Sequence, residues 1–430
     1  MPGGRTRHLL AATSRRTGNR PGDAVSFEPA SWLASWWRRG YVVPVRKSLQ
    51  GLRFAGLVLT AAAGTLLLPS VTGAAPSGHT TDAAVQRLVN RLVATPGGPV
   101  GAIVTLYRNG RTTVLRAGRA DAARPGAPRL GDHMRIASIS KAFTGAVALH
   151  LVQEGLLGLD DTIGQRLRGV TPRAWSKVTL REMLNHTSGL PDYTQSEGFL
   201  EQATTNPHGY VSPMQIIGWV RGKRLMFTPG SRYQYSNTDN IVVGLIAQRV
   251  TRRSFGQLLS TLVFGPAGLR QTSFPTRMIS LPAPFMHGYD VEPGKPPQDV
   301  TTFLSPSGAW ASGAIVSTPA DLGAFIRADL SGRFFGAAQR REQLRFIAGS
   351  SSPPGPGKNA AGLAIFRYQT RCGTVYGHTG NFPGYVQWAA GTADGRRSVT
   401  TSLNIAAPTG ALLQQLRSLQ TTAVCALLGK

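Results

Sequence analysis

The segment from Ser138 to Glu154 is apolar over almost its whole length, and it constrains the fold more than any other part of the chain. At helical spacing its side chains leave almost no polar face, and Gly155 follows as a stop signal. A helix that is apolar nearly all round has to be buried in a protein core. The segment nevertheless opens with Ser138 and Lys141, two polar residues one turn apart, and burial alone does not explain them.

The first 75 residues differ in character from the rest. Arg46, Lys47 and Arg53 precede an apolar stretch over residues 54–68, and small residues follow. This order is typical of a secretory signal peptide cleaved around residues 72–75, and the stretch is short for a membrane span. We therefore expect residues 1–75 to be an N-terminal extension with a signal peptide, and the protein to be secreted or associated with the cell wall or membrane. Residues 1–45 exceed what a signal peptide needs, which a start codon assigned too early or a cytoplasmic extension with an uncleaved anchor would explain.

The charge balance is strongly basic. The 430 residues hold 47 Lys and Arg against 20 Asp and Glu, a net charge of +27. Residues 1–74 hold ten of the basic and two of the acidic residues, so +19 remains without them. Such a charge favours polyanionic surroundings. Because we find no helix-turn-helix, zinc-finger or RNA-binding pattern, we expect anionic cell-wall polymers rather than nucleic acid as partners.

The order of predicted elements indicates an α+β fold. A helix is predicted over residues 80–98, followed by a hairpin over 101–118 whose strands are joined by Asn109-Gly110. Short helices occupy residues 156–300, alternating strand patterns return from residue 362, and a helix runs from residue 410 to the end. Residues 351–362 have the composition of a flexible loop. We expect an antiparallel sheet (residues 76–135 and 305–430) flanked by N- and C-terminal helices, with an inserted mostly helical part over about 136–304.

The pair at the start of the apolar helix is suited to acyl transfer. Residues i and i+3 share a helix face, so Ser138 and Lys141 should meet there. A poorly solvated lysine has a lowered pKa and can act as a general base for a neighbouring hydroxyl. The pair alone is weak evidence, because a capping serine and a lysine that reaches solvent give the same pattern.

Two further motifs strengthen this interpretation. Tyr235 and Asn237 are two residues apart in an extended segment, so both can face one cleft. His378-Thr379-Gly380 follows on a predicted strand, with a glycine where a substrate backbone can approach closely.

Ser-x-x-Lys, Tyr-x-Asn and His-Thr-Gly, in this order, are similar to the three motifs of the serine penicillin-recognising enzymes. Over residues 80–428 the chain resembles their class C β-lactamase/DD-peptidase branch, and within it the extracellular D-Ala-D-Ala carboxypeptidase/transpeptidase type. The resemblance implies a β-lactamase/transpeptidase-like fold. It implies that Ser138 is the acylated nucleophile, Lys141 its base, Tyr235 the proton relay to the leaving group, and Asn237 a ligand of the substrate amide.

The resemblance also assigns residues around this centre. His378, Thr379 and Gly380 would line the opposite wall, and the backbone N–H groups of Ser138 and Asn381 would form the oxyanion hole. Trp310 matches an aromatic residue that walls the cleft in the family, with ordinary packing as the alternative.

The chain has two cysteines, Cys372 and Cys425, and an even number in an exported protein favours a disulfide over two unrelated thiols. The family carries a disulfide at the corresponding places.

One part of the family pattern is missing. The carboxypeptidases hold the substrate's terminal carboxylate with an arginine and a threonine, whereas this chain has Phe366 and Asn381 there. Because a strand alternates faces, Arg367 would point away. We expect Glu182 to be a helix surface residue and His186 a local hydrogen-bonding residue.

The sequence therefore predicts an exported serine hydrolase, most simply a D-alanyl-D-alanine carboxypeptidase-type enzyme. An esterase or β-lactamase of the same fold, and a catalytically silent penicillin-binding-type module that keeps the fold, are the alternatives. Expected ligands are small peptides or esters, peptidoglycan stem peptides and β-lactams. We expect no cofactor and no metal, and a monomer.

Overall fold

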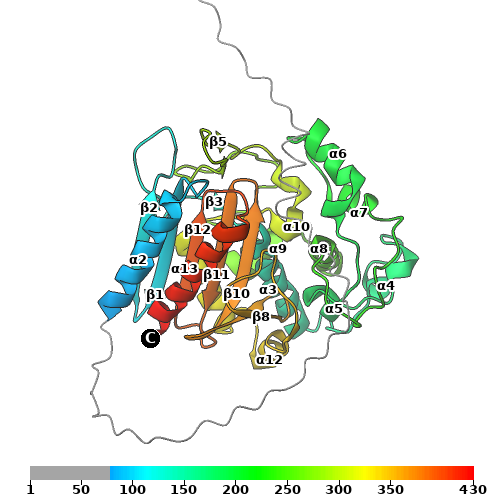
Figure 1. Ribbon diagram of the computed structural model, residues 1–430. Helices are drawn as coiled ribbons and strands as arrows, with labels where there is room; N and C mark the ends of the chain where they lie inside the picture. Colours follow the sequence, from blue (N-terminus) through cyan, green and yellow to red (C-terminus); the bar gives the residue numbers. More distant parts are fainter. Residues whose placement is uncertain (1–77) are drawn as a thin grey trace, which may run out of the picture.

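The computed structural model describes residues 78–430, so the predicted signal peptide lies outside the described residues. An eight-stranded antiparallel sheet forms the centre, in the order β2-β1-β12-β11-β10-β9-β8-β7 (Figure 1). Its strands are β1 (Gly101–Arg108), β2 (Arg111–Gly118), β7 (Ile347–Ala348), β8 (Lys358–Ala361), β9 (Phe366–Thr370), β10 (Gly373–Phe382), β11 (Tyr385–Gly391) and β12 (Ser398–Leu403). Two short pairs lie outside it: β3 (Met134–Arg135) with β6 (Val316–Ser317), and β4 (Tyr289–Asp290) with β5 (Gln298–Asp299).

The first and last strands of the described residues build one half of the sheet together. β1 pairs with β12, with Ala102 opposite Leu403. Helices α2 (Gly78–Ala94) and α13 (Gly410–Leu428) lie side by side across one face, and their apolar residues share one core with the strands (Figure 1). This confirms the predicted antiparallel sheet flanked by N- and C-terminal helices.

The predicted hairpin and its turn are confirmed. β1 and β2 pair from Gly101 opposite Gly118 to Arg108 opposite Arg111. Asn109 and Gly110 between them both have positive φ, of 53° and 76°. A two-residue turn of this kind matches the twist of a hairpin, which is why Asn-Gly is favoured there.

Helix α3 (Ser140–Gln153) is the buried helix expected from its apolar sequence. Its residues from Ser140 to Leu149 are all buried, and Gly155 follows its end with a φ of +71°. The α-helix begins two residues later than predicted, because Ser138 lies in a preceding 3₁₀ turn, η1 (Ala137–Ile139).

The remaining helices lie on the other side of the sheet and beside it (Figure 1). They are α4 (Ile163–Arg166), α5 (Leu180–Leu184), α6 (Glu197–Thr205), α7 (Pro213–Gly218), α8 (Asn237–Thr251), α9 (Phe255–Leu259), α10 (Trp310–Gly313), α11 (Pro319–Leu330) and α12 (Ala337–Gln343). Short 3₁₀ turns are η2 (Arg173–Trp175), η3 (Tyr193–Gln195) and η5 (Pro306–Gly308), and η4 (Ser260–Phe264) is a π-helical turn after α9. Among the helices of residues 78–430, none is both long and apolar enough to cross a membrane.

The prediction of a flexible loop over residues 351–362 was wrong for its second half. Residues Lys358–Ala361 form β8, which pairs with β9 and contributes the buried Ala361 to the core. The stretch Lys-Asn-Ala-Ala has no alternating pattern and few strand-favouring residues. It becomes a strand because β9 offers it a free edge.

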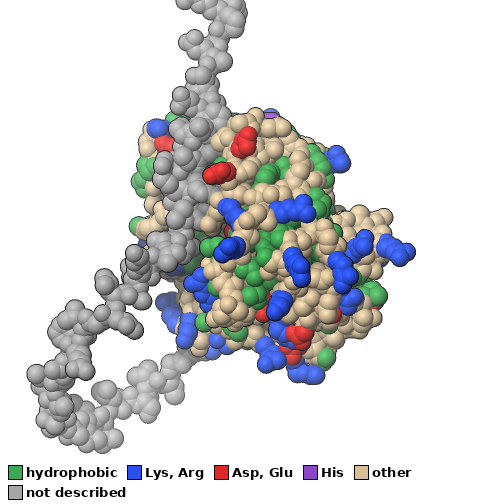
Figure 2. All heavy atoms as spheres, turned by 90° about the vertical axis from the view of Figure 1, so that its right-hand side faces the viewer, with side chains coloured by type: hydrophobic (Ala, Val, Ile, Leu, Met, Phe, Trp, Pro, Cys, Tyr) green, Lys and Arg blue, Asp and Glu red, His purple; other side chains and the backbone are tan. Residues whose placement is uncertain are grey.

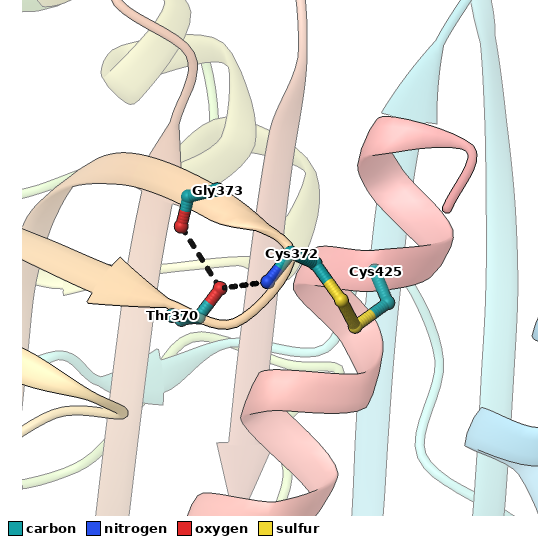
Figure 3. The surroundings of a disulfide bond; sticks show 4 residues. All are labelled: Thr370, Cys372, Gly373 and Cys425. Atoms are coloured by element: carbon teal, nitrogen blue, oxygen red, sulfur yellow. Dashed lines mark hydrogen bonds between the residues drawn. A yellow bond between two sulfur atoms is a disulfide. The ribbon is translucent and has the colours of Figure 1, made fainter. Parts of the chain in front are cut away.

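One disulfide ties α13 to the sheet. Cys372 lies in the turn between β9 and β10 and is bonded to Cys425, with a Cα–Cα distance of 5.1 Å (Figure 3). Thr370 holds this turn, because its Oγ1 accepts from Cys372 N at 3.2 Å and donates to Gly373 O at 2.9 Å (Figure 3). The expected pairing of the two cysteines is confirmed.

Candidate active site

Ser138 lies at the mouth of the site, on the turn that leads into α3. It is half-buried between the buried Ala137 and Ile139. Ala137 has a φ of +51°, a conformation that non-glycine residues rarely adopt. Backbone strain of this kind persists only where the surroundings hold it, and it is common next to functional groups.

Lys141 is fully buried directly behind Ser138. Its Nζ lies 3.0 Å from Ser138 Oγ, 2.7 Å from Asn237 Oδ1 and 2.8 Å from the carbonyl oxygen of Ser312. Burial lowers the pKa of Lys141 to about 7, while the charges of Asp192 and Asp239 raise it.

Burial favours the uncharged form of Lys141, and its contacts suit that form. A neutral amine has two N–H bonds and one lone pair. Asn237 Oδ1 and Ser312 O can accept only, so in this form they take both N–H bonds, and the lone pair is left for the hydroxyl of Ser138. In its uncharged form Lys141 is placed to act as a general base on Ser138.

Asn237, the first residue of α8, is fixed at both ends of its amide. Its Oδ1 accepts from Lys141, and its Nδ2 donates to Asp192 Oδ2 at 2.9 Å. Because Asp192 can only accept, it determines which way the amide of Asn237 points. Asp192 is in turn held by Thr194, whose N and Oγ1 donate to its Oδ1 at 3.0 and 2.8 Å.

Tyr235 lies on the other side of Lys141. Its ring centroid is 5.1 Å from Lys141 Nζ, 4.4 Å from the ring of His186 and 6.4 Å from the ring of His378. Burial and the charge of Lys141 lower the pKa of both histidines to about 3, so both imidazoles are neutral at pH 7. The ring of Tyr235 therefore lies beside Lys141, and the two imidazoles near that ring carry no charge at pH 7.

His186 is a local hydrogen-bonding residue, as expected. Its Nδ1 lies 2.7 Å from Asp239 Oδ2, and Ser188 Oγ donates to the other carboxylate oxygen at 2.5 Å. Burial raises the pKa of Asp239 well above its usual value. Glu182 is more than a surface residue: it forms a capping box with Thr179 at the start of α5.

The third motif lies along an edge of β10 that no further strand covers. β9 pairs with β10 only as far as Gly377, so His378, Thr379 and Gly380 have β11 as their only strand neighbour. The free side of this edge faces η1. A Cβ on Gly380 would lie 2.3 Å from the carbonyl oxygen of Ile136, so this glycine allows β10 to approach the turn that carries the nucleophile. The close approach at Gly380 is thus made by the protein's own backbone.

Two side chains of this motif are engaged within the protein. Thr379 Oγ1 donates to the carbonyl oxygen of Pro353 at 2.8 Å. His378 Nδ1 lies 2.6 Å from the carbonyl oxygen of Thr379. His378 and Thr379 do not line the pocket described next.

A mostly apolar pocket of about 460 Å³, counting its open mouth, lies in front of Ser138. Its lining combines η1, η3, α6, α10 and the end of β10, and includes Tyr193, Phe199, Asn237, Asn381 and Phe382. No lysine or arginine is among its lining residues. It therefore offers an uncharged space to whatever is attached to a bound carbonyl group.

Trp310 does not line this pocket. Its ring lies 5.3 Å from that of Phe255, and a Cβ on Gly244 would come within 2.7 Å of it. The side chain is 6 % exposed and belongs to the core between α8, α9 and α10. The alternative of ordinary packing is the one that the structure supports.

The structure also places the residues that replace the carboxylate-binding pair. Phe366 is buried, with its ring 5.0 Å from that of His378. Arg367 points to the other face, where its guanidinium lies 5.1 Å from the ring of Phe346. The alternation of β9 therefore removes Arg367 from the site, as expected.

Sequence reasoning missed the groups that orient Lys141 and Asn237. Ser312 acts through a backbone carbonyl, which leaves no signal in the side-chain pattern. Asp192 follows Leu190-Pro191 and is 45 residues from Asn237, and only the fold brings Asp192 and Asn237 together.

Comparison with known proteins now assigns the family. A profile of the Beta-lactamase family matches residues 85–420. The chain belongs to the beta-lactamase family. This confirms the resemblance to serine penicillin-recognising enzymes and identifies a serine hydrolase of the β-lactamase and penicillin-binding protein fold.

Individual proteins share about a third or less of their residues with this chain over the aligned parts. Penicillin-binding protein 4* of Bacillus subtilis (strain 168) is 32% identical over 147 residues, 34% of this chain and 31% of that protein. The chain thus spans about a third of the curated relatives it matches. A D-stereospecific amidohydrolase from Streptomyces sp. is 30% identical with a TM-score of 0.69, covering 79% of this chain and 98% of that one. D-amino acid amidase from Ochrobactrum anthropi SV3, complexed with D-phenylalanine, is 24% identical with a TM-score of 0.70, covering 81% and 99%.

Proposed function

We propose that the protein is an exported serine amidase that cleaves an amide bond of D-amino acid derivatives through an acyl-enzyme on Ser138. The observation that carries this proposal is the contact of 3.0 Å between Ser138 Oγ and the buried Nζ of Lys141. The choice of D-amino acid derivatives is supported by the similarity to the D-stereospecific amidohydrolase over 98% of that chain.

Acylation uses the geometry around Lys141. Ser138 Oγ adds to the carbonyl carbon of the substrate while its proton moves to the lone pair of Lys141 Nζ. The backbone N–H groups of Ser138 and Asn381 stabilise the negative oxygen of the tetrahedral intermediate; loss of one such donor costs about 3–4 kcal/mol in comparable enzymes. The C–N bond then breaks, and the leaving amine takes a proton that passes from Lys141 through Tyr235.

Deacylation repeats these steps with water as the nucleophile. Water adds to the ester carbonyl and gives up a proton to the base. The bond to Ser138 Oγ then breaks, and the proton returns to that oxygen. The acid is released with Ser138 and Lys141 in their starting states, so no cofactor enters the balance.

The nature of the pocket favours an uncharged amide over a peptide with a free C-terminal carboxylate. The positions that would hold a carboxylate are occupied by Phe366 and Asn381, and Arg367 lies on the opposite face of β9. The lining of the pocket contains Tyr193 and Phe199 rather than a cation. A carboxylate placed there would lose its hydration without gaining a partner.

A D-alanyl-D-alanine carboxypeptidase is the second candidate. It is favoured by the complete set of three motifs, in which Tyr235 and Asn237 contact Lys141 and the charge of Lys141 acts on the buried His378. Under this alternative, Asn381 would have to bind the terminal carboxylate through its amide.

The test compares four substrates with the purified protein. D-phenylalanine amide, its L-enantiomer, a diacetyl-L-lysyl-D-alanyl-D-alanine peptide and a short-chain nitrophenyl ester are offered at equal concentration. We expect ammonia release from the D-amide, with kcat/KM at least about tenfold above the L-amide and above D-alanine release from the peptide. Faster cleavage of the peptide would establish the carboxypeptidase instead, and turnover of the ester alone would establish an esterase. Absence of turnover together with absence of labelling by a fluorescent penicillin would leave the silent binding module.

A further inference from the structure

A second site lies at the far end of the sheet from Ser138, in a polar groove lined by four arginines. Arg327 comes from α11, Arg333 follows that helix, and Arg396 and Arg397 come from the turn between β11 and β12. Tyr107 of β1 completes the floor. Two separate segments of the chain therefore bring cationic side chains to one concave surface.

Arg327 is held in place at the floor of this arginine groove. Its guanidinium stacks 3.7 Å from the centre of the Tyr107 ring, and its Nη1 donates to Ser398 Oγ at 2.8 Å. Both contacts fix the plane of the guanidinium, so less rotational freedom is lost when a ligand binds.

Two more arginines are oriented by backbone carbonyls. Arg397 Nη1 donates to the carbonyl oxygen of Leu427 at 3.0 Å, and Arg333 Nη1 donates to that of Pro266 at 3.4 Å. Each of these bonds uses one of the five N–H donors of a guanidinium. The other donors remain for a ligand.

The arginine groove keeps most of its positive charge. Within residues 78–430, Arg327, Arg333 and Arg397 form no ion pair. Asp394 is the single acidic residue of the lining, and its side chain is 57% exposed and 4.0 Å from Arg396. Four cations thus face one weakly paired carboxylate.

This groove is separated from the catalytic centre by the length of a strand. β11 begins at Tyr385, two residues after Pro383 of the Ser138 pocket, and ends at Gly391, three residues before Asp394. Seven residues of strand span roughly 20 Å. The C-terminal end of α13, which supplies the Leu427 carbonyl, lies at the lower end of the sheet in Figure 1. A ligand in the groove leaves the mouth of the pocket open.

We propose that the arginine groove binds a phosphate-bearing anionic polymer and holds the enzyme on it while Ser138 acts on other molecules. Guanidinium forks match the oxygens of phosphate and bind them in pairs. Cations distributed along a groove fit successive charges of a chain. The proposal stands independently of the substrate of Ser138.

Other basic residues gather on the face of the helices beside the sheet (Figure 2). They include Arg221, Lys223 and Arg224 after α7, all exposed. No side-chain hydrogen bond or ion pair within the described residues positions these three. We infer that they add long-range attraction without forming a site, and they provide a control of equal charge.

The experiment measures binding of the protein to fluorescent poly(glycerol phosphate) by anisotropy at several salt concentrations. The groove variant R333Q/R396Q/R397Q is compared with the control variant R221Q/K223Q/R224Q, which also removes three positive charges. We expect the groove variant to bind the polymer at least about tenfold more weakly, and the control variant to bind less than about threefold more weakly. The slope of log K against log salt concentration should fall in magnitude by about 2–3 in the groove variant. Turnover of a small ester should be unchanged in both. R333Q/R396Q against R221Q/K223Q serves if the triple variant does not fold.

Several outcomes would overturn the proposal. Equal losses in the two triple variants would mean that net charge alone drives binding, and unchanged binding in the groove variant would exclude the groove. Displacement of the polymer by inorganic phosphate at equal phosphate concentration would mean a small-anion site. Equally tight binding of polygalacturonate would refute the assignment to phosphate.

Discussion

Removing the charge of Asp192 should lower the pKa of Lys141 and extend activity to lower pH. The amide of Asn237 joins the two groups, accepting from Lys141 at 2.7 Å and donating to Asp192 at 2.9 Å. Burial lowers the pKa of Lys141 to about 7, and the charge of Asp192 opposes that shift. Asp192→Asn removes this opposition and keeps an oxygen that can accept from Asn237 and Thr194.

The size of the shift follows from Coulomb's law. Across the bridging amide the two charges are on the order of 7 Å apart, and at an effective dielectric constant of about 20 they interact by about 2 kcal/mol. This corresponds to about 1.5 pKa units, and because Asp192 is partly exposed to solvent we expect about 0.5–1.5 units.

The assay follows kcat/KM for a neutral N-acylated D-amino acid ester from about pH 5 to about pH 9, which reports the pKa of the base in the free enzyme. Only the unprotonated amine can accept the proton of Ser138, so activity should rise with pH, with a midpoint near 7 in the native protein. Burial lowers the pKa of His186 and His378 to about 3, so neither histidine produces this rise of activity with pH.

The exposed Asp160 provides a control, because Asp160→Asn removes one carboxylate far from Lys141 and should leave the midpoint unchanged. A midpoint in Asp192→Asn that stays in place or moves to higher pH would refute the assignment of Lys141 as the base. So would a midpoint near 10 in the native protein.

Four further predictions address the nucleophile, the disulfide and two buried positions. Ser138→Ala should abolish turnover of every substrate with a Tm within about 2 °C of the native protein, since the side chain supports no core; retained turnover would show that another group is acylated. Reduction of Cys372–Cys425, which closes a loop of 53 residues, should lower the free energy of unfolding in urea by up to about 4 kcal/mol, and two titratable thiols before reduction would contradict this. Burial raises the pKa of Asp329 to about 7. Native stability should therefore fall as pH rises from about 4 to about 7, because the carboxyl ionises in the unfolded protein but not in the folded one. Asp329→Asn should raise the Tm at pH 8 but hardly at pH 4. Gly380→Ala places a methyl group 2.3 Å from the backbone oxygen of Ile136. It should reduce kcat/KM by at least about tenfold and the free energy of unfolding by about 1–3 kcal/mol. A fully active variant would mean that β10 can move away at no cost.

Local signals in the sequence predicted local structure well. The hairpin turn at Asn109-Gly110 follows from residues that tolerate positive φ. The contact of Ser138 with Lys141 follows from helical spacing, even though Ser138 lies on a 3₁₀ turn. The opposite faces of Phe366 and Arg367 follow from strand alternation, since Phe366 and Tyr368 are buried and Arg367 lies against Phe346 on the other face.

Long-range partners could not be predicted in the same way. Lys141 Nζ donates hydrogen bonds to Ser312 O, 171 positions away in the sequence, and to Asn237 Oδ1, 96 positions away. A backbone carbonyl is present at every residue, so nothing in the sequence marks the one that reaches the lysine. Ala360 and Ala361 likewise became part of a strand through a neighbour rather than through their own propensity.

The burial of Lys141 and its role as a base depend on the same arrangement of acceptors. A protonated amine would need three acceptors, and its third N–H would then point at Ser138 Oγ and lower the nucleophilicity of that oxygen. Within the described residues the other two acceptors are Asn237 Oδ1 and Ser312 O, and the ring of Tyr235 lies beside the amine. Desolvation therefore favours the uncharged amine, and that form directs its lone pair to the hydroxyl. It follows that any substitution which lets water reach Lys141 should reduce catalysis even where Ser138 keeps its position.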